Sequence, residues 1–282
     1  MRTYYAICRD VVAQADRERY LATLYAPQEH RDALFAVFAF GLEIARVRDV
    51  AREPLPGEIR LQWWREVLHG ERGEQGLANP VSAALLDTIR ARDLPLSPFE
   101  RLIDAHTFDL YNEPMVSVAA LETYAAETQG ALLATGARIL GLRETEYAAI
   151  LQATANALIF AQVLTDLPRH AARKQLYIPA DVLAHYSAKR EDILARNATT
   201  EVRAALAEMR LRARKYLDEA ERLRNTASAG ILPLLLPASL VRPALQRMER
   251  QSYEPFAVES EASWRRQWRL WRAARDPRKI FA

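Results

Sequence analysis

The chain has 282 residues, of which 50% are apolar and 27% are charged, as is ordinary for a soluble globular protein. The net charge of +3 is concentrated at one end: residues 264–282 hold seven cations and one acid, net +6, so the rest of the chain carries net −3 and the surface is not basic throughout. The single cysteine, Cys8, excludes an intramolecular disulfide framework and fits a reducing compartment.

Apolar runs in this chain are short. None approaches the ~20 residues that a bilayer-spanning helix needs. Charged residues near the N-terminus stand where a signal peptide has its apolar core. We therefore expect a cytoplasmic protein, with peripheral contact to the inner membrane left open.

Apolar residues recur at helical spacing along almost the whole chain, and no alternating segment is long enough to predict a strand. No Gly/Ser linker, low-complexity tract or fixed repeat divides it. We therefore predict one all-α domain over residues 1–282. The predicted helices occupy residues 31–52, 58–68, 80–92, 97–113, 118–140, 144–166, 200–227, 229–248 and 260–275.

The first candidate site is the segment FAFGLEIARVRD, residues 38–49, in a predicted helix. Asp49 is its aspartate, and Arg46 and Arg48 stand beside it. A lone aspartate among arginines most often forms a surface ion pair of small energy.

The second candidate site is the segment NALIFAQVLTDLPRHAARKQLYIP, residues 156–179. Gln162, Asp166 and His170 are spaced by four, so a helix would place them on one face. Structural explanations exist here too. His170 follows a proline at a predicted helix end, where a protonated histidine is favourable, and Tyr177 could be a core aromatic with a satisfied hydroxyl.

Together these segments resemble the two aspartate-rich regions of the squalene/phytoene synthase family, each of which carries Asp-x-x-x-Asp. Ala45 and Asp49 stand at the first pair of aspartate positions, and Asp166 and His170 stand at the second pair. The residues Phe38, Ala39, Phe40, Arg173, Tyr177 and Pro179 fall at family spacing, whereas Gly41 and Leu42 replace a Cys-Arg pair.

The resemblance covers about residues 10–275 and extends to two further segments. DRERYLATLYAP (16–27) and GEIRLQWWREVL (57–68) are similar to a subgroup that includes the phytoene-synthase-like assembly factor of mitochondrial respiratory complex I and its bacterial relatives. Trp63 and Trp64 are expected to pack in a helix layer. The resemblance implies an all-α isoprenoid synthase bundle with a central cavity.

Family members join two isoprenoid diphosphates, and the resemblance implies a chemistry for each residue. Paired carboxylates hold Mg²⁺ ions through oxygen ligands, and the metal neutralises the departing pyrophosphate. Only two of the four carboxylates remain. If activity survives, the resemblance implies that Asp49 and Asp166 are catalytic. It also implies a set of weak metal ligands and a set of residues that contact the diphosphate. The metal set is Asp49, Gln162 and Asp166, and the substrate set is Arg31, Arg46, His170, Arg173 and Tyr177.

Two functions follow from the resemblance. The first is a catalytically reduced or inactive relative without a tightly bound cofactor, which binds an isoprenoid, another lipid or a partner protein and takes part in respiratory complex I assembly. The alternative is an active Mg²⁺-dependent prenyltransferase that condenses farnesyl or geranylgeranyl diphosphate head to head. Product analysis with both diphosphates and Mg²⁺ separates them.

The C-terminal segment 264–282 carries a separate hypothesis. Tryptophans recur at i, i+4 and i+7 among arginines, which suits a helix lying on an anionic membrane surface. The alternative is a terminal helix that packs its tryptophans on the bundle. No nucleic-acid-binding motif is recognised. The membrane candidates are Trp264, Arg265, Trp268, Arg269, Trp271 and Arg272.

Overall fold

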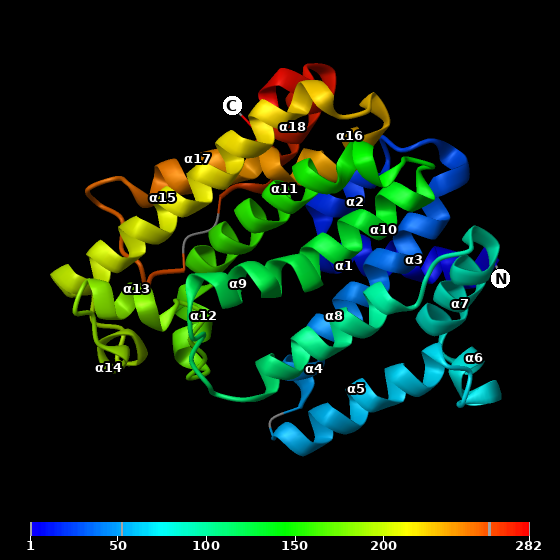
Figure 1. The fold of residues 1–282 in the computed structure, drawn as a ribbon, viewed down its shortest axis with the longest axis horizontal. Helices are drawn as coiled ribbons and strands as arrows, with labels where there is room; N and C mark the ends of the chain where they lie inside the picture. The colour runs from blue at the N-terminus through cyan, green and yellow to red at the C-terminus, as the bar shows by residue number, and fades with distance from the viewer. Residues whose placement is uncertain (1, 52, 259–260, 282) are drawn as a thin grey trace.

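A computed structural model describes residues 2–51, 53–258 and 261–281, and within these ranges the regular structure is helical, with one isolated β-bridge between Pro114 and Leu176 (Figure 1). The prediction of an all-α fold is confirmed. The α-helices are α1 (Arg2–Ala15), α2 (Arg17–Thr23), α3 (Gln28–Ala45), α4 (Val47–Val50), α5 (Pro54–Leu68), α6 (Gly73–Ala78), α7 (Pro80–Arg92), α8 (Ser97–Thr107), α9 (Val118–Ala125), α10 (Ala131–Ile139), α11 (Glu144–Thr165), α12 (Leu167–Ala172), α13 (Ala180–His185), α14 (Arg190–Leu194), α15 (Thr200–Leu223), α16 (Leu232–Leu235), α17 (Val241–Met248) and α18 (Ser263–Arg275). Short 3₁₀ or π segments are η1 (Phe108–Leu110), η2 (Ala126–Gly130), η3 (Arg224–Thr226), η4 (Ala229–Ile231), η5 (Leu236–Leu240) and η6 (Pro277–Lys279).

Local capping signals set several helix ends. The Asn79 side chain accepts hydrogen bonds from the first backbone N–H groups of α7, and Ser117 does the same for α9. Gly141 has φ +75°, a left-handed conformation that glycine adopts without steric cost, and it separates α10 from α11. These boundaries are local and follow from the sequence.

The core is built around two sets of packed helices. α11 lies along α15, where the Phe160 and Tyr216 rings are 5.1 Å apart, and α3 packs between α1, α7 and α10 (Figure 1). Trp64 of α5 is 4% exposed, and its ring meets that of Phe40 edge to face at 5.2 Å, so its expected packing role is confirmed. α3 approaches α10 closely at Gly41, where a Cβ would lie 2.6 Å from a Leu132 methyl carbon.

Both candidate motifs cross a helix end, of which only the one in the second motif was predicted from the sequence. The predicted helix 31–52 is divided at Arg46 into α3 and α4, and its residue 52 lies outside the described residues. α11 ends at Thr165 with Asp166 as its C-cap, because Pro168 has no N–H to donate to the Leu164 carbonyl and its ring clashes with that carbonyl. The prediction of an unbroken helix at the first motif was therefore wrong, whereas the end predicted for the helix 144–166 is confirmed to within one residue.

Other boundaries also differ from the prediction. The expected helix 118–140 contains the π segment η2 between α9 and α10, and such segments are frequent at functional sites. The helix predicted for 260–275 starts at Ser263, and residue 260 lies outside the described part. Helices α1 and α2 were not predicted.

In the part of the chain that the structure describes, two helical stretches are long and apolar enough to cross a membrane by length and composition alone, Glu144–Thr165 and Ala229–Met248. In the first, 67% of the apolar window is buried in the bundle, and in the second 50%. Core helices of this kind pass the same test, so the finding is weak evidence for a span.

Candidate functional site

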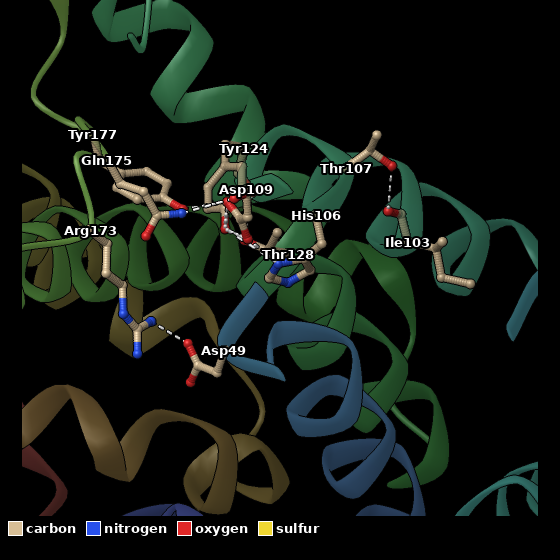
Figure 2. A network of polar contacts seen from close by, with 10 residues as sticks. All are labelled: Asp49, Ile103, His106, Thr107, Asp109, Tyr124, Thr128, Arg173, Gln175 and Tyr177. Atoms are coloured by element: carbon tan, nitrogen blue, oxygen red, sulfur yellow. Dashed lines mark hydrogen bonds and ion pairs between the residues drawn. The ribbon is translucent and has the colours of Figure 1, made fainter. Parts of the chain in front are cut away.

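The two aspartate-rich segments meet in an ion pair. Asp49 lies on α4, and Arg173 caps α12, 124 positions later in the chain. The Arg173 guanidinium donates a hydrogen bond to the Asp49 carboxylate (Figure 2). Both side chains are about one-third exposed. The surface-ion-pair interpretation of Asp49 is thus correct, and its partner comes from the second motif.

Asp166 at the end of α11 is also held by an arginine. Arg169 donates to its carboxylate at 2.8 Å, and the Gln162 amide lies 3.5 Å from the same oxygen. The backbone N–H of His170 donates to the Asp166 carbonyl, so the spacing of four is kept across the helix end. Both remaining aspartates of the motifs therefore face a guanidinium.

His170 lies where a fourth carboxylate would stand in the family pattern. Its ring centre is 4.5 Å from that of Tyr177. Burial lowers the pKa of His170 from 6.5 to about 4, more than the neighbouring Asp166 raises it. The lowered pKa favours the neutral form of His170, which gains nothing from the helix dipole, and this argues against the protonated-histidine interpretation.

A buried polar network lies next to this motif, centred on Asp109 of η1 (Figure 2). The Tyr177 hydroxyl donates to the Asp109 carboxylate at 2.5 Å, and the Tyr124 hydroxyl donates to it at 3.0 Å. His106 Nδ1 lies 2.6 Å from Asp109 Oδ2, the carboxylate oxygen that Tyr177 does not contact, and the Gln175 amide donates to the Asp109 carbonyl at 2.9 Å. Asp109 is only 7% exposed, so this network replaces its hydration.

Backbone pairing holds the two parts of this network together. The Met115 N–H donates to the Leu176 carbonyl at 3.1 Å, and the Ala180 N–H donates to the Met115 carbonyl at 2.8 Å. This short pairing fixes Gln175 and Tyr177 beside η1.

Both tyrosines of the network are held in the neutral form. Burial, followed by the nearby Asp109 charge, raises the pKa of Tyr124 and of Tyr177 well above 10. The interpretation of Tyr177 as a core aromatic with a satisfied hydroxyl is correct, since it is 8% exposed and bonded to Asp109.

Two other expected substrate-binding residues lie elsewhere. Arg31 is in the first turn of α3 and donates to the Ala26 carbonyl at 2.8 Å. Arg31 lies 14 residues, or about 21 Å of helix, before the last residue of α3, so it is at the opposite end of α3 from the first motif. The Arg46 guanidinium lies 3.9 Å from the Glu43 carboxylate, and Arg46 lines a cavity beside the first motif.

That cavity has a volume of about 320 Å³ and lies between α3, α4 and α5. Its walls combine indoles and aliphatic side chains with charged groups. The lining residues are Glu43, Arg46, Val47, Val50, Arg60, Trp63, Trp64 and Asn79. It is therefore adjacent to the first motif and on the α5 side of it.

Metal-binding potential is limited at this site. No group of three or more His, Cys, Asp and Glu side chains suited to hold a metal occurs in the described ranges. Asp49 and Asp166, with Gln162, are the oxygen donors of the two motifs, and each carboxylate is bonded to arginine. This donor set does not fit a cluster of several Mg²⁺ ions.

The sequence analysis missed the Asp109 network. A signal was present: His106 and Asp109 are spaced by three on the apolar face of the predicted helix 97–113, where ionisable residues are uncommon. The membrane candidates occupy α18, which contacts α2 and η5 rather than the two motifs.

Comparison with proteins of known sequence gives two groups of relatives. The chain is 26% identical over 249 residues to the NADH dehydrogenase (ubiquinone) complex I assembly factor 6 of Rattus norvegicus, with 88% of this chain and 75% of the relative covered. The human assembly factor gives 26% identity over 251 residues, with the same coverage. This chain is also 25% identical over 277 residues to a 15-cis-phytoene synthase of Synechococcus elongatus, and the match covers 93% of this chain and 89% of that enzyme.

Solved structures share the architecture. Squalene synthase HpnC from Alicyclobacillus acidocaldarius superposes with a TM-score of 0.78 at 26% identity, covering 90% of this chain and 96% of that one. A dehydrosqualene synthase in complex with ligand gives a TM-score of 0.84 at 16% identity, covering 98% and 96%, which shows the fold alone. The model of the squalene/phytoene synthase family matches residues 12–272. With this match and an isoprenoid synthase helical fold, the chain belongs to the squalene/phytoene synthase family.

Proposed function

We propose that this protein is a catalytically inactive or strongly reduced member of its family that acts by binding. The ion pair between Asp49 and Arg173 carries the proposal. In a metal-dependent prenyltransferase the two motifs face each other with carboxylates, and cations fill the space between them. Here a guanidinium from the second motif neutralises the carboxylate of the first.

The electrostatics of the site support this view. Asp166 is paired with Arg169, and the remaining ligand positions hold Ala45 and a half-buried His170 with a lowered pKa. A divalent ion would have to displace two arginines to gain two carboxylates. The same arginines can instead contact an anionic group directly, without metal.

The process we propose is respiratory complex I assembly. The similarity to complex I assembly factor 6 extends over 88% of this chain and supports this assignment. The partner would then be an assembly intermediate or another assembly protein, recognised by a surface of the bundle rather than by catalysis.

The cavity between α3, α4 and α5 is the proposed lipid site. Its volume of about 320 Å³ is in the range of small-molecule pockets. Trp63 and Val47 offer apolar walls, and Arg46 and Arg60 offer cations for an anionic head group. The expected ligand is an isoprenoid or another amphiphile with such a head group. Titration with farnesyl phosphate should quench tryptophan fluorescence, and Trp63→Phe should reduce the quenching.

Product analysis tests the absence of catalysis. The purified protein is incubated with farnesyl diphosphate or geranylgeranyl diphosphate and Mg²⁺, and hydrocarbon products and released pyrophosphate are measured. We expect neither product. Head-to-head condensation at a rate typical of enzymes, on the order of 1 s⁻¹ or above, would overturn the proposal.

Genetic complementation tests the role in assembly. Cells that lack the protein should lose membrane NADH:quinone oxidoreductase activity, and the wild-type chain should restore it. Asp49→Asn with Asp166→Asn should restore it equally well, because the carboxylates are not needed to hold metal. Failure of this variant, at normal protein level, would show that the aspartates have a chemical role.

The competing proposal is an active head-to-head prenyltransferase. The 25% identity to a phytoene synthase over 277 residues supports it. It requires that Asp49, Asp166 and Gln162 release their arginine and amide contacts and hold Mg²⁺. The product assay separates the two proposals directly.

A further inference from the structure

The C-terminal helix α18 turns its tryptophans away from the bundle. Trp264, Trp268 and Trp271 are 65%, 49% and 43% exposed. The helix is anchored instead by Leu270 and Ala273, each 1% exposed. The alternative in which the tryptophans pack on the bundle is therefore wrong.

Helical geometry explains this division. Successive residues advance by ~100°, so the three indoles fall within about 60° of the helix circumference. Leu270 and Ala273 lie on the opposite side. From Trp264 to Arg275 the row of indoles and arginines is about 16 Å long. Figure 1 places α18 at an edge of the molecule, beside the C-terminus and far from α5.

The arginines of α18 have two different functions. Arg266 pairs with Glu18 of α2 at 3.0 Å, and Arg269 pairs with Glu261. These two cations fasten the helix to the rest of the chain. Arg269 was expected to contact the membrane, and the structure places it with the anchoring residues.

The other three arginines stack on the exposed indoles. The guanidinium of Arg265 lies 5.3 Å from the Trp264 ring centre, Arg272 lies 5.0 Å from Trp268, and Arg275 lies 4.1 Å from Trp271. Within the described ranges, no ion pair joins these three arginines to a carboxylate. We call this surface the indole–arginine face; it consists of Trp264, Arg265, Trp268, Trp271, Arg272 and Arg275.

We propose that the indole–arginine face binds the surface of an anionic lipid bilayer. Indoles prefer the depth of the lipid head groups, and guanidinium groups bind phosphate oxygens in a bidentate manner. Stacking holds each guanidinium at the same depth as its indole, so a single layer of lipid head groups can contact both groups. The face has charge complementarity to anionic lipid, because it carries three cations and no acid. The proposal is independent of the proposed function, since α18 does not contact the two motifs.

Vesicle flotation tests the proposal. One set of vesicles contains phosphatidylcholine alone, and the other contains equal parts of phosphatidylcholine and phosphatidylglycerol. We expect binding to the anionic set only, and weakening of that binding between ~0.1 M and ~1 M salt. Absence of binding to the anionic vesicles would overturn the proposal.

Matched charge variants locate the face. Arg265→Gln/Arg272→Gln/Arg275→Gln should weaken binding on the order of 100-fold, because each cation near an anionic surface contributes about fivefold. The control removes the same charge from exposed positions on other elements, and it should change affinity by less than about fivefold. This control is Arg90→Gln/Arg101→Gln/Lys189→Gln. Equal losses of vesicle affinity in the two variants would refute the proposal that binding is specific to the indole–arginine face.

Depth measurement separates a bilayer from other anionic partners. Brominated lipid should quench tryptophan fluorescence in the wild-type protein, and Trp264→Ala/Trp268→Ala/Trp271→Ala should remove most of that quenching. The main result, quenching by brominated lipid, is measured on the wild-type protein and does not depend on whether the variant folds. If heparin or duplex DNA binds as tightly as anionic vesicles and brominated lipid does not quench, the occupant is another polyanion and the proposal is wrong.

Discussion

The Asp109 network should dominate the stability of the region that joins α8, α9 and the second motif. Asp109→Ala removes the acceptor of the Tyr124 and Tyr177 hydroxyls and the neighbour of His106 Nδ1. All of these groups are largely buried, so water cannot fully replace the carboxylate. A lost bond to a charged group costs about 1.5–3 kcal/mol, and breaking a buried charged network costs about 3–5 kcal/mol.

We expect the free energy of unfolding to fall by about 3–5 kcal/mol in Asp109→Ala. With a urea m-value of about 3 kcal/mol/M, the midpoint should fall by about 1–2 M. The control is Asp104→Ala on the preceding helix α8, since Asp104 is 62% exposed and pairs with Arg65 at the surface. An exposed pair contributes about 0.2–1 kcal/mol.

The reasoning also predicts a coupling. Tyr177→Phe should cost about 1.5–3 kcal/mol in the wild-type background and less in Asp109→Ala, where the hydroxyl has already lost its acceptor. If Asp109→Ala is no more destabilising than Asp104→Ala, or if the Tyr177→Phe effects simply add, the network does not act as described.

Three further predictions concern the motifs and α18. Ala45→Asp with His170→Asp should produce Mg²⁺-dependent binding of a diphosphate analogue in calorimetry. If it produces none, the site has diverged at other positions, of which Leu42 and Ile159, where the family often has Arg and Gln, are the next to examine. Because burial lowers the pKa of His170 from 6.5 to about 4, the unfolded chain binds more protons than the folded one between these values. Stability in urea should therefore fall as the pH falls from about 6.5 to 4, and a slope that is the same in His170→Gln would contradict this. Trp268→Ala should lower Tm by no more than about 2 °C, since the indole is 49% exposed; a loss of several degrees would mean that this tryptophan belongs to the core.

The sequence determined the helical architecture because helical periodicity and capping are local properties. Apolar residues every three to four positions, Asn79 before Pro80, and Gly141 between two apolar segments set their helices without reference to the rest of the fold. The family resemblance came from spacing within short windows, which is also local. The structure confirmed the fold class, and the match of the family model confirmed the family.

Only the tertiary structure decided what the site residues contact. Arg173 reaches Asp49 across 124 positions, and Tyr177 reaches Asp109 across 68, and neither pairing has a signal in the local pattern. The same holds for His170, whose charge depends on burial by neighbouring elements rather than on its place in a helix. On α18 the sequence places the tryptophans on one face, but which face meets the bundle is decided by Leu270 and Ala273 packing against it, and this exposes the indoles.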